Sequence, residues 1–285
     1  MLKLTEVSKK VGVFSLNNIS FMLGKGYIMG LIGENGSGKT TILNIILGLY
    51  KPDKGTVHLF GMNYSGSEGD EKKIKKDIGF VMTDELFYPA VTLYGNAEIY
   101  GKYYENYDRN ILDDYLRRFK LDKKQKYKEL SKGQKLKFQF AFALAHQPKL
   151  LVLDEPTAKF DPEFREQFLK TITEFVSDGE HSVILATHLT SDLDKIADYI
   201  TFIHHGEVLI SQDIETFLDK YSIVQGEKYK IKLINEDRVV HMEENELGTT
   251  ALVKNTKYGK SYDKMLKVRR PTVEEIMYYT IKGMK

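Results

Sequence analysis

The chain has no cysteine among its 285 residues, which excludes disulfide bonds and thiolate chemistry. Its formal net charge is only +2, too small to indicate a nucleic-acid-binding protein. It contains no run of about 18 apolar residues that could cross a bilayer as a helix. The first ten residues, MLKLTEVSKK, lack the apolar stretch of a secretory signal. We therefore expect a cytoplasmic protein whose contact with a membrane is peripheral.

What is present is ordinary for a globular protein with a sizeable core. Hydrophobic residues make up 42% and charged residues 29% of the chain. The length suits one large domain, or one domain with a small appendix. Lysine clusters at 72–76 and 123–128 have acidic and apolar residues around them, so we interpret them as solvated helix faces rather than nucleic-acid-binding patches.

The segment 31–41 reads LIGENGSGKTT and fits the phosphate-binding loop G-x-x-x-x-G-K-[ST]. Its glycines let the backbone turn several N–H groups towards an anion. In this motif the lysine reaches the terminal phosphates and the following hydroxyl ligates Mg²⁺. A predicted strand at 27–32 and a predicted helix at 41–49 flank the loop, so phosphate would meet the positive end of a helix. The residues expected to hold the nucleotide here are Gly33, Glu34, Asn35, Gly36, Ser37, Gly38, Lys39, Thr40 and Thr41.

Two carboxylates follow a second apolar run. The run 150–153 ends in Asp154 and Glu155, a pattern typical of a buried parallel strand. Active sites of open α/β sheets lie at such strand ends. Phosphoryl transfer needs a phosphate loop, a carboxylate for the metal and a group that orients the attacking water. Asp154 is therefore a candidate Mg²⁺ ligand together with Thr40, and Glu155 is the candidate catalytic base.

The apolar patterns predict an α/β fold with a β-rich lead-in. Strands are expected at 3–7, 18–23, 27–32, 56–60, 77–82, 150–153, 182–187 and 199–204, and helices at 68–76, 135–146 and 162–176. A Tyr-rich helical region at 92–119 belongs to a predicted helical subdomain that spans about 84–146. From 221 to 285 short strands at 228–233, 238–242 and 251–254, with a terminal helix after Pro271, predict a small α+β appendix. We therefore expect one domain over 1–220 and an extension over 221–285.

The pentapeptide at 130–134, LSKGQ, lies between the phosphate loop and the segment LLVLDEPT. With these neighbours it resembles the LSGGQ signature of ABC transporter ATPases, and the resemblance covers about residues 1–220. It implies a homo- or heterodimer in which the signature segment of one subunit closes over the ATP held by the phosphate loop of the other. Ser131, Gly133, Gln134 and the start of the next helix would then form a second anion cradle.

Further residues match this family in order. His188, preceded by Ala186-Thr187, matches the switch histidine, which contacts the γ-phosphate and helps to hold Glu155 and the water in line. Asp161 matches the D-loop aspartate that touches the opposite subunit, and it also suits the N-cap of the helix at 162–176.

Three positions depart from the family pattern. A metal-binding glutamine is usual where this chain has Thr83, followed by Asp84 and Glu85, so Thr83 and Asp84 become candidate metal ligands. The aromatic residue that stacks on adenine falls near Val11, which leaves Phe14 as the candidate. Lys159-Phe160 replaces a small residue and a leucine before Asp161, and this adds charge to the expected dimer interface.

The chain resembles the ATPase subunits of bacterial ABC exporters, some of which end in a helix like PTVEEI at 271–276. This implies a separate transmembrane subunit, docked on the tyrosine-rich region 83–101 at the cytoplasmic face of the membrane. Exporters of toxic or antimicrobial peptides have ATPases of this size with a substituted glutamine, which extends the expectation to such a cargo. The competing class is a soluble ABC ATPase that acts as a regulator or on nucleic acid.

Overall fold

The computed structural model describes residues 1–64, 68–83, 85–245, 248–255 and 266–284. The candidate metal ligand Asp84 lies outside the described residues. Within the described ranges, no helix is long and apolar enough to cross a membrane.

A six-stranded sheet in the order β10-β9-β3-β8-β7-β6 forms the centre of the molecule. Its strands are β3 (Ile28–Ile32), β6 (Ile78–Val81), β7 (Leu150–Asp154), β8 (Ser182–Ala186), β9 (Tyr199–His204) and β10 (Glu207–Asp213). The strands run parallel except for β10, which pairs antiparallel with β9. A parallel sheet brings the carboxyl ends of its strands to one edge, so the phosphate loop after β3 and the carboxylates at the end of β7 meet there.

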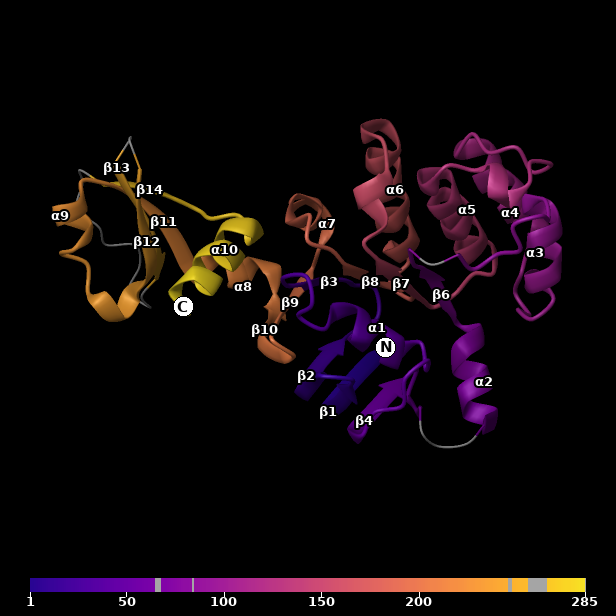
Figure 1. Cartoon of the computed structure of the whole chain (residues 1–285), viewed down its shortest axis with the longest axis horizontal. Coiled ribbons are helices and arrows are strands. Elements are labelled where there is room, and N and C mark those ends of the chain that lie inside the picture. The colour runs from indigo at the N-terminus through magenta and orange to yellow at the C-terminus, as the bar shows by residue number, and fades with distance from the viewer. Residues whose placement is uncertain (65–67, 84, 246–247, 256–265, 285) are drawn as a thin grey trace.

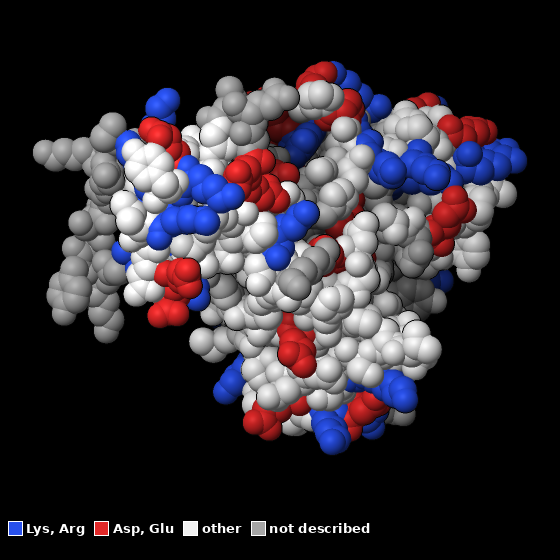
Figure 2. All heavy atoms as spheres, turned by 60° about the vertical axis from the view of Figure 1, so that its left-hand side comes forward, with Lys and Arg blue, Asp and Glu red and all other residues white. Residues whose placement is uncertain are grey.

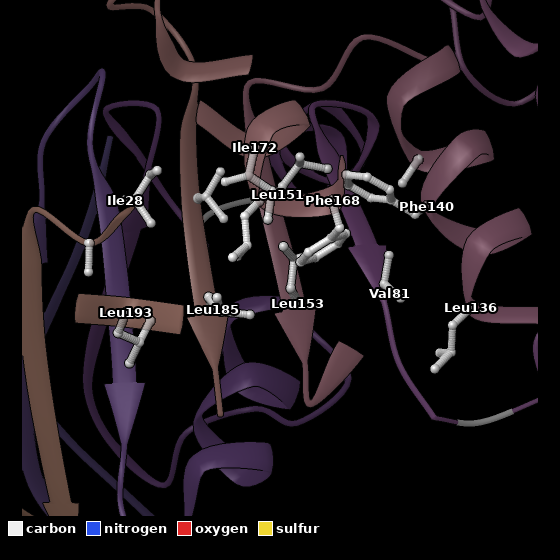
Figure 3. Close-up of a cluster of buried hydrophobic side chains, with 14 of the residues drawn as sticks. Ile28, Val81, Leu136, Phe140, Leu151, Leu153, Phe168, Ile172, Leu185 and Leu193 are labelled. Carbon is white, nitrogen blue, oxygen red and sulfur yellow. The ribbon is translucent and has the colours of Figure 1, made fainter. Parts of the chain in front are cut away.

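Alternate side chains of the central strands enter two different cores. Leu151 and Leu153 of β7 pack with Phe168 and Ile172 of α6 (Pro162–Val176) on one face, as Figure 3 shows. Val152 lies on the other face, in the core that holds the apolar residues of α1 (Lys39–Ile46). Because successive side chains of a strand point to opposite faces, a continuous apolar run is what a sheet covered on both faces requires.

The β-rich lead-in is an antiparallel sheet in the order β2-β1-β4-β5. Its strands are β1 (Leu2–Val11), β2 (Phe14–Leu23), β4 (Lys54–Leu59) and β5 (Met62–Asn63). The inward side chains of this sheet share one core with α1. The helix α2 (Glu68–Lys76) then leads into β6. The phosphate loop thus contacts both sheets, at Ile203 of β9 and at Phe14 and Leu16 of β2.

The helical subdomain contains α3 (Leu93–Gly101), α4 (Arg109–Arg118) and α5 (Lys132–Ala145). The region that the sequence presents as one helical stretch, 92–119, divides into two helices. The second helix, α4, begins after Asp108, because the Asp108 carboxylate accepts the backbone N–H groups of Asn110 and Ile111 and so caps α4.

Residues from 214 onwards form α8 (Ile214–Asp219), β11 (Tyr221–Gly226), α9 (Lys228–Ile231), β12 (Val239–Asn245), β13 (Gly248–Lys254), β14 (Lys267–Arg269) and α10 (Val273–Gly283). The strands make a separate antiparallel sheet in the order β12-β13-β11-β14. This extension and α3–α5 lie at opposite ends of the molecule (Figure 1). In the view of Figure 2, in which the left-hand side of Figure 1 is turned towards the viewer, acidic and basic side chains are interspersed over the surface. The division at 220 stays a prediction.

One element of the extension corrects the sequence analysis. The segment 228–233 is predicted as a strand, but the structure has the helix α9 there. The alternation of lysine with apolar residues, KYKIKL, favours a strand only if its apolar residues share one buried face. In the fold Ile231 is fully buried, whereas Tyr229 is 59% and Leu233 is 78% exposed. The contact that Ile231 makes with the small core of the extension outweighs the local pattern.

Candidate nucleotide-binding site

The phosphate loop has the backbone that its glycines predict. Gly33 and Gly38 have φ angles of 155° and 114°, a region that side chains other than glycine rarely adopt. A Cβ at Gly33 would lie 2.2 Å from the carbonyl oxygen of Ile203, and one at Gly38 would lie 2.9 Å from the Phe14 ring. Glycine is therefore required at both positions, by conformation and by space.

Lys39 lies at the centre of this loop and is only 5% exposed. Its Nζ donates hydrogen bonds to the carbonyl oxygens of Gly33, at 2.8 Å, and Glu34, at 3.2 Å. Burial lowers the pKa of Lys39, and the carboxylates of Glu155 and Asp154 oppose that shift. The loop thus holds a buried cation inside a ring of backbone groups, where a phosphate would be attracted.

Thr40 of α1 and Asp154 at the end of β7 are in direct contact. The Thr40 hydroxyl donates a hydrogen bond of 2.9 Å to Oδ2 of Asp154, and Asp154 is 6% exposed. A hydroxyl and a buried carboxylate are oxygen ligands of the kind that Mg²⁺ takes beside nucleotide phosphates. Among the described residues no group of three or more His, Asp or Glu side chains gathers to hold a metal alone. This donor set fits a metal that is also bound by a nucleotide.

Glu155 and His188 form the second pair of the site. Nδ1 of His188 lies 2.6 Å from Oε2 of Glu155, and the His188 backbone N–H donates to the same oxygen at 3.3 Å. The Glu155 backbone N–H donates to the carbonyl oxygen of Ala186 at 2.9 Å, which ties the end of β7 to that of β8. Glu155 also has a left-handed φ of 49°, so the turn that presents its carboxylate is held in a strained conformation.

These groups border one open cleft of about 390 Å³. It is lined by Val11, Phe14, Asn35, Gly36, Gly38, Lys39, Thr40, Thr41, Asp154 and Glu155. The cleft therefore brings together most of the predicted phosphate loop, the candidate metal ligands Thr40 and Asp154, and the candidate base Glu155. Phe14, the candidate for stacking on adenine, is half-buried at the rim of this cleft.

The signature residues form a second group, and none of them lines this cleft. Ser131 and Gln134 hold each other in a capping box at the start of α5: the Ser131 hydroxyl accepts the Gln134 N–H, and the Gln134 side-chain oxygen accepts the Ser131 N–H. A Cβ at Gly133 would lie 2.8 Å from the carbonyl oxygen of Lys159. The start of α5 is therefore packed against the D-loop.

Asp161 belongs to this second group. Its Oδ1 accepts the backbone N–H of Phe164 at 2.9 Å and so caps α6, as the sequence predicts. Its Oδ2 lies 3.1 Å from Nζ of Lys137, one turn into α5. The signature helix and the D-loop helix are thus joined by an ion pair as well as by close packing.

The substituted glutamine position is not drawn into the cleft. Thr83 is exposed and is not among the residues that line the cleft. Glu85 pairs with Lys135 of α5. The metal role of Thr83 and Asp84 stays a prediction.

Sequence reasoning missed two contacts that support the loop. The backbone N–H of Gly206 donates to the carbonyl oxygen of Ser37 at 2.9 Å. Nδ1 of His204 lies 3.7 Å from Oε2 of Glu34. His204 is the last residue of β9 and Gly206 lies in the turn that follows it, about 170 residues after the loop, and no motif marks them.

Comparison with known proteins agrees with this geometry. A family described as "ABC transporter" matches residues 16–158, half of the chain. The chain belongs to the ABC transporter family. The bacitracin transport ATP-binding protein BcrA of Bacillus licheniformis is 30% identical, over 73% of this chain and 68% of the relative. The lantibiotic transport ATP-binding protein SrtF of Streptococcus pyogenes is 30% identical, over 75% and 92%.

A solved structure is similar to this ABC protein over most of its length. It is the dimeric, post-hydrolysis state of the ATP-binding cassette MJ0796 with ADP and Pi, 27% identical with a TM-score of 0.68, over 75% of this chain and 99% of that one. The expected family, fold class and ATPase activity are confirmed. The chain is the ATP-binding and ATP-hydrolysing subunit of an ABC transporter, and the similarity to transport proteins favours this over the soluble alternative.

Proposed function

We propose that this ABC subunit powers the export of amphipathic or antimicrobial peptides. In this proposal the subunit is bound to a transmembrane subunit at the cytoplasmic face of the membrane. The proposal is supported by two relatives named for the transport of bacitracin and of a lantibiotic. The cargo would be bound by the membrane subunit, so the contribution of this chain is the ATP-driven motion.

In this proposal each polar group of the site has a separate role in ATP hydrolysis. Lys39 and the loop N–H groups bind the β- and γ-phosphates. Thr40 and Asp154 would hold Mg²⁺, which supplies electrostatic stabilisation of the charge on the transferring phosphoryl group. Glu155 accepts a proton from the attacking water, and His188 fixes the carboxylate through the 2.6 Å contact between Nδ1 and Oε2.

The second group of residues would complete the site in a partner subunit. Ser131, the Gly133 backbone and the start of α5 offer N–H groups and a helix N-terminus to the γ-phosphate bound by the other cleft. Loss of the γ-phosphate removes the group that both surfaces share, and the two subunits separate. This opening is the motion that the transmembrane subunit would use.

The membrane subunit would dock on an apolar hollow of about 240 Å³ between β6 and the helical subdomain. Its lining includes Leu86, Tyr100 and Tyr104. Tyr104 stacks on His146, with ring centroids 4.0 Å apart, and burial lowers the pKa of that histidine. A neutral, aromatic hollow suits the apolar side of a short helix.

Co-purification tests this function. Detergent extraction of the tagged chain should recover a polytopic membrane protein, and Leu86→Glu should abolish that recovery. Tyr103→Glu is the matched control, because Tyr103 is 64% exposed and does not line the hollow. Cells that lack the chain should become more sensitive to bacitracin-like peptides or lantibiotics. Recovery with RNA and without a membrane protein would refute the proposal.

A further inference from the structure

The segment that follows His188 is anchored to two distant parts of the chain. It forms a short 3-10 turn, Thr190–Asp192, that continues into α7 (Leu193–Ile196). Leu193 is fully buried and packs over Gly30 of β3, where a Cβ would lie 2.7 Å from Leu193 Cδ1. Figure 3 shows Leu193 beside the central strands. The turn is therefore seated on the strand that leads into the phosphate loop.

The first anchor comes from α6, the helix that Asp161 caps. Nε of Arg165 donates to Oδ1 of Asp192 at 2.8 Å, and its Nη2 donates to Oγ of Ser191 at 3.1 Å. Asp192 is 1% exposed, and a charge so deep in the fold needs such a partner. This ion pair fixes the turn relative to the D-loop.

The second anchor comes from the C-terminal extension. Oδ1 of Asp194, in α7, accepts the backbone N–H of Val273 at 3.2 Å. Val273 is the first residue of α10, whose N-cap Thr272 forms a capping box with Glu275. Burial and the nearby carboxylates of Glu274 and Glu275 raise the pKa of Asp194, and the hydrogen bond from the Val273 N–H opposes that shift. Val273 and Ile276 are fully buried in the same core as Leu193.

We propose that Asp194 and α10 form a positioning device for hydrolysis, in which the C-terminal extension holds the switch histidine His188 against Glu155. This rests on the proposed function of that pair. The Asp194–Val273 hydrogen bond holds α7, and the Arg165–Asp192 pair holds the turn just before it. His188 lies between β8 and α7, so β8 sets where the chain reaches His188 and α7 sets where it goes afterwards. The extension is thereby a part of the catalytic apparatus without touching the nucleotide.

The hydrogen bond can be removed from either side with little other change. Val273→Pro deletes the donor and also replaces a fully buried side chain. The backbone accommodates it, because proline is well tolerated at the first position of a helix and Thr272 before it is extended, with φ −85° and ψ 165°. Val273→Ala is the matched control, since it keeps the N–H and loses only buried methyl groups. Asp194→Ala removes the acceptor, and Asp194→Asn retains an acceptor oxygen.

In the full-length chain, Val273→Pro and Asp194→Ala should each lower kcat by about tenfold. A displacement of a catalytic group by about 1 Å can cost about a hundredfold in rate, and we expect a smaller displacement of His188 here. The KM for ATP should not change, because the phosphate loop is untouched. Asp194→Asn should retain kcat, and Val273→Ala should lower only the thermal midpoint. The Asp194→Ala, Val273→Pro double variant should be no slower than either single variant, because both remove one bond.

Equal kcat values for Val273→Pro and Val273→Ala, or additive losses in the double variant, would overturn the proposal. A parallel measurement on His188→Ala separates this from failure of the proposed function. If His188→Ala abolishes turnover while Val273→Pro leaves kcat unchanged, only the positioning role is refuted. If His188→Ala itself retains turnover, the assigned role of the histidine is wrong.

Discussion

The nucleotide cleft and the signature group differ in how their polar side chains are satisfied. In the cleft the contacts join separate elements: Nζ of Lys39 lies 3.9 Å from Oε1 of Glu155, Thr40 meets Asp154, and Glu155 meets His188. In the signature group Ser131 and Gln134 make a local cap, and the Lys137–Asp161 pair joins the two helices of the group. The cleft is a site assembled by the fold of one chain. The signature group is a finished local structure whose ligand would arrive with another subunit.

The difference predicts that variants in the cleft act on chemistry and on binding, whereas variants in the signature group act on the site of a partner. A side chain whose contacts are all local can be removed without disturbing the cleft of its own chain. Four predictions test this division, in order of decreasing effect.

Glu155→Gln should reduce ATP turnover by about a hundredfold or more, because it removes the base and leaves the phosphate loop intact. ATP affinity should be retained, and a closed dimer should accumulate with ATP and Mg²⁺. Single-turnover hydrolysis and size-exclusion chromatography measure both effects. A variant that hydrolyses at the parent rate would remove Glu155 from this role.

Lys39→Ala should weaken ATP binding by about tenfold to a hundredfold, since it deletes the buried cation of the loop and its charge-assisted hydrogen bonds. Equilibrium binding of a fluorescent ATP analogue measures this. Lys137→Ala serves as a control that removes a lysine outside the cleft. Unchanged affinity in Lys39→Ala would contradict the assignment of the phosphate loop.

Ser131→Ala should lower turnover by less than Lys39→Ala, while ATP binding to its own chain is unchanged. If the dimer is formed by two copies of this chain, a mixture of Lys39→Ala and Ser131→Ala chains should regain part of the turnover that each has lost. One of the two composite sites then carries neither substitution. Absence of recovery in a mixture shown to form mixed dimers would place both half-sites within one chain.

Lys137→Ala should have the smallest effect. It removes the pair with the exposed Asp161, and ion pairs with an exposed member contribute little to stability, so the thermal midpoint should change by about 2 °C at most. Asp161→Ala should lower it further, because it removes the cap of α6 as well. Calorimetry compares the two. A larger loss for Lys137→Ala would show that the signature helix and the D-loop depend on this bridge.

The sequence predicts the elements around the cleft well because local and tertiary signals agree there. The helix 162–176 is found with both ends as predicted, since Asp161, Pro162 and the apolar spacing all indicate the same start. The extension shows the opposite case. The strand β11 is not predicted, although Tyr221, Ile223 and Val224 favour a strand, and β14 is only three residues long. The helix α9 replaces a predicted strand, and Ile231 is its fully buried apolar residue.

The site divides in the same way. The phosphate loop, Asp154, Glu155 and His188 follow from motifs, because phosphate chemistry demands particular residues at particular spacings. The support from Gly206 and the anchor between Asp194 and Val273 could not be predicted. Both depend on backbone N–H groups brought from far along the chain, and an N–H group is present in almost every residue.

The contact of Gly133 with the carbonyl of Lys159 leaves no room between signature and D-loop for even one methyl group. We therefore expect the two segments to move together when subunits approach or part. A force that a neighbouring subunit exerts on the signature segment would then be transmitted to the D-loop, because close-packed segments transmit strain.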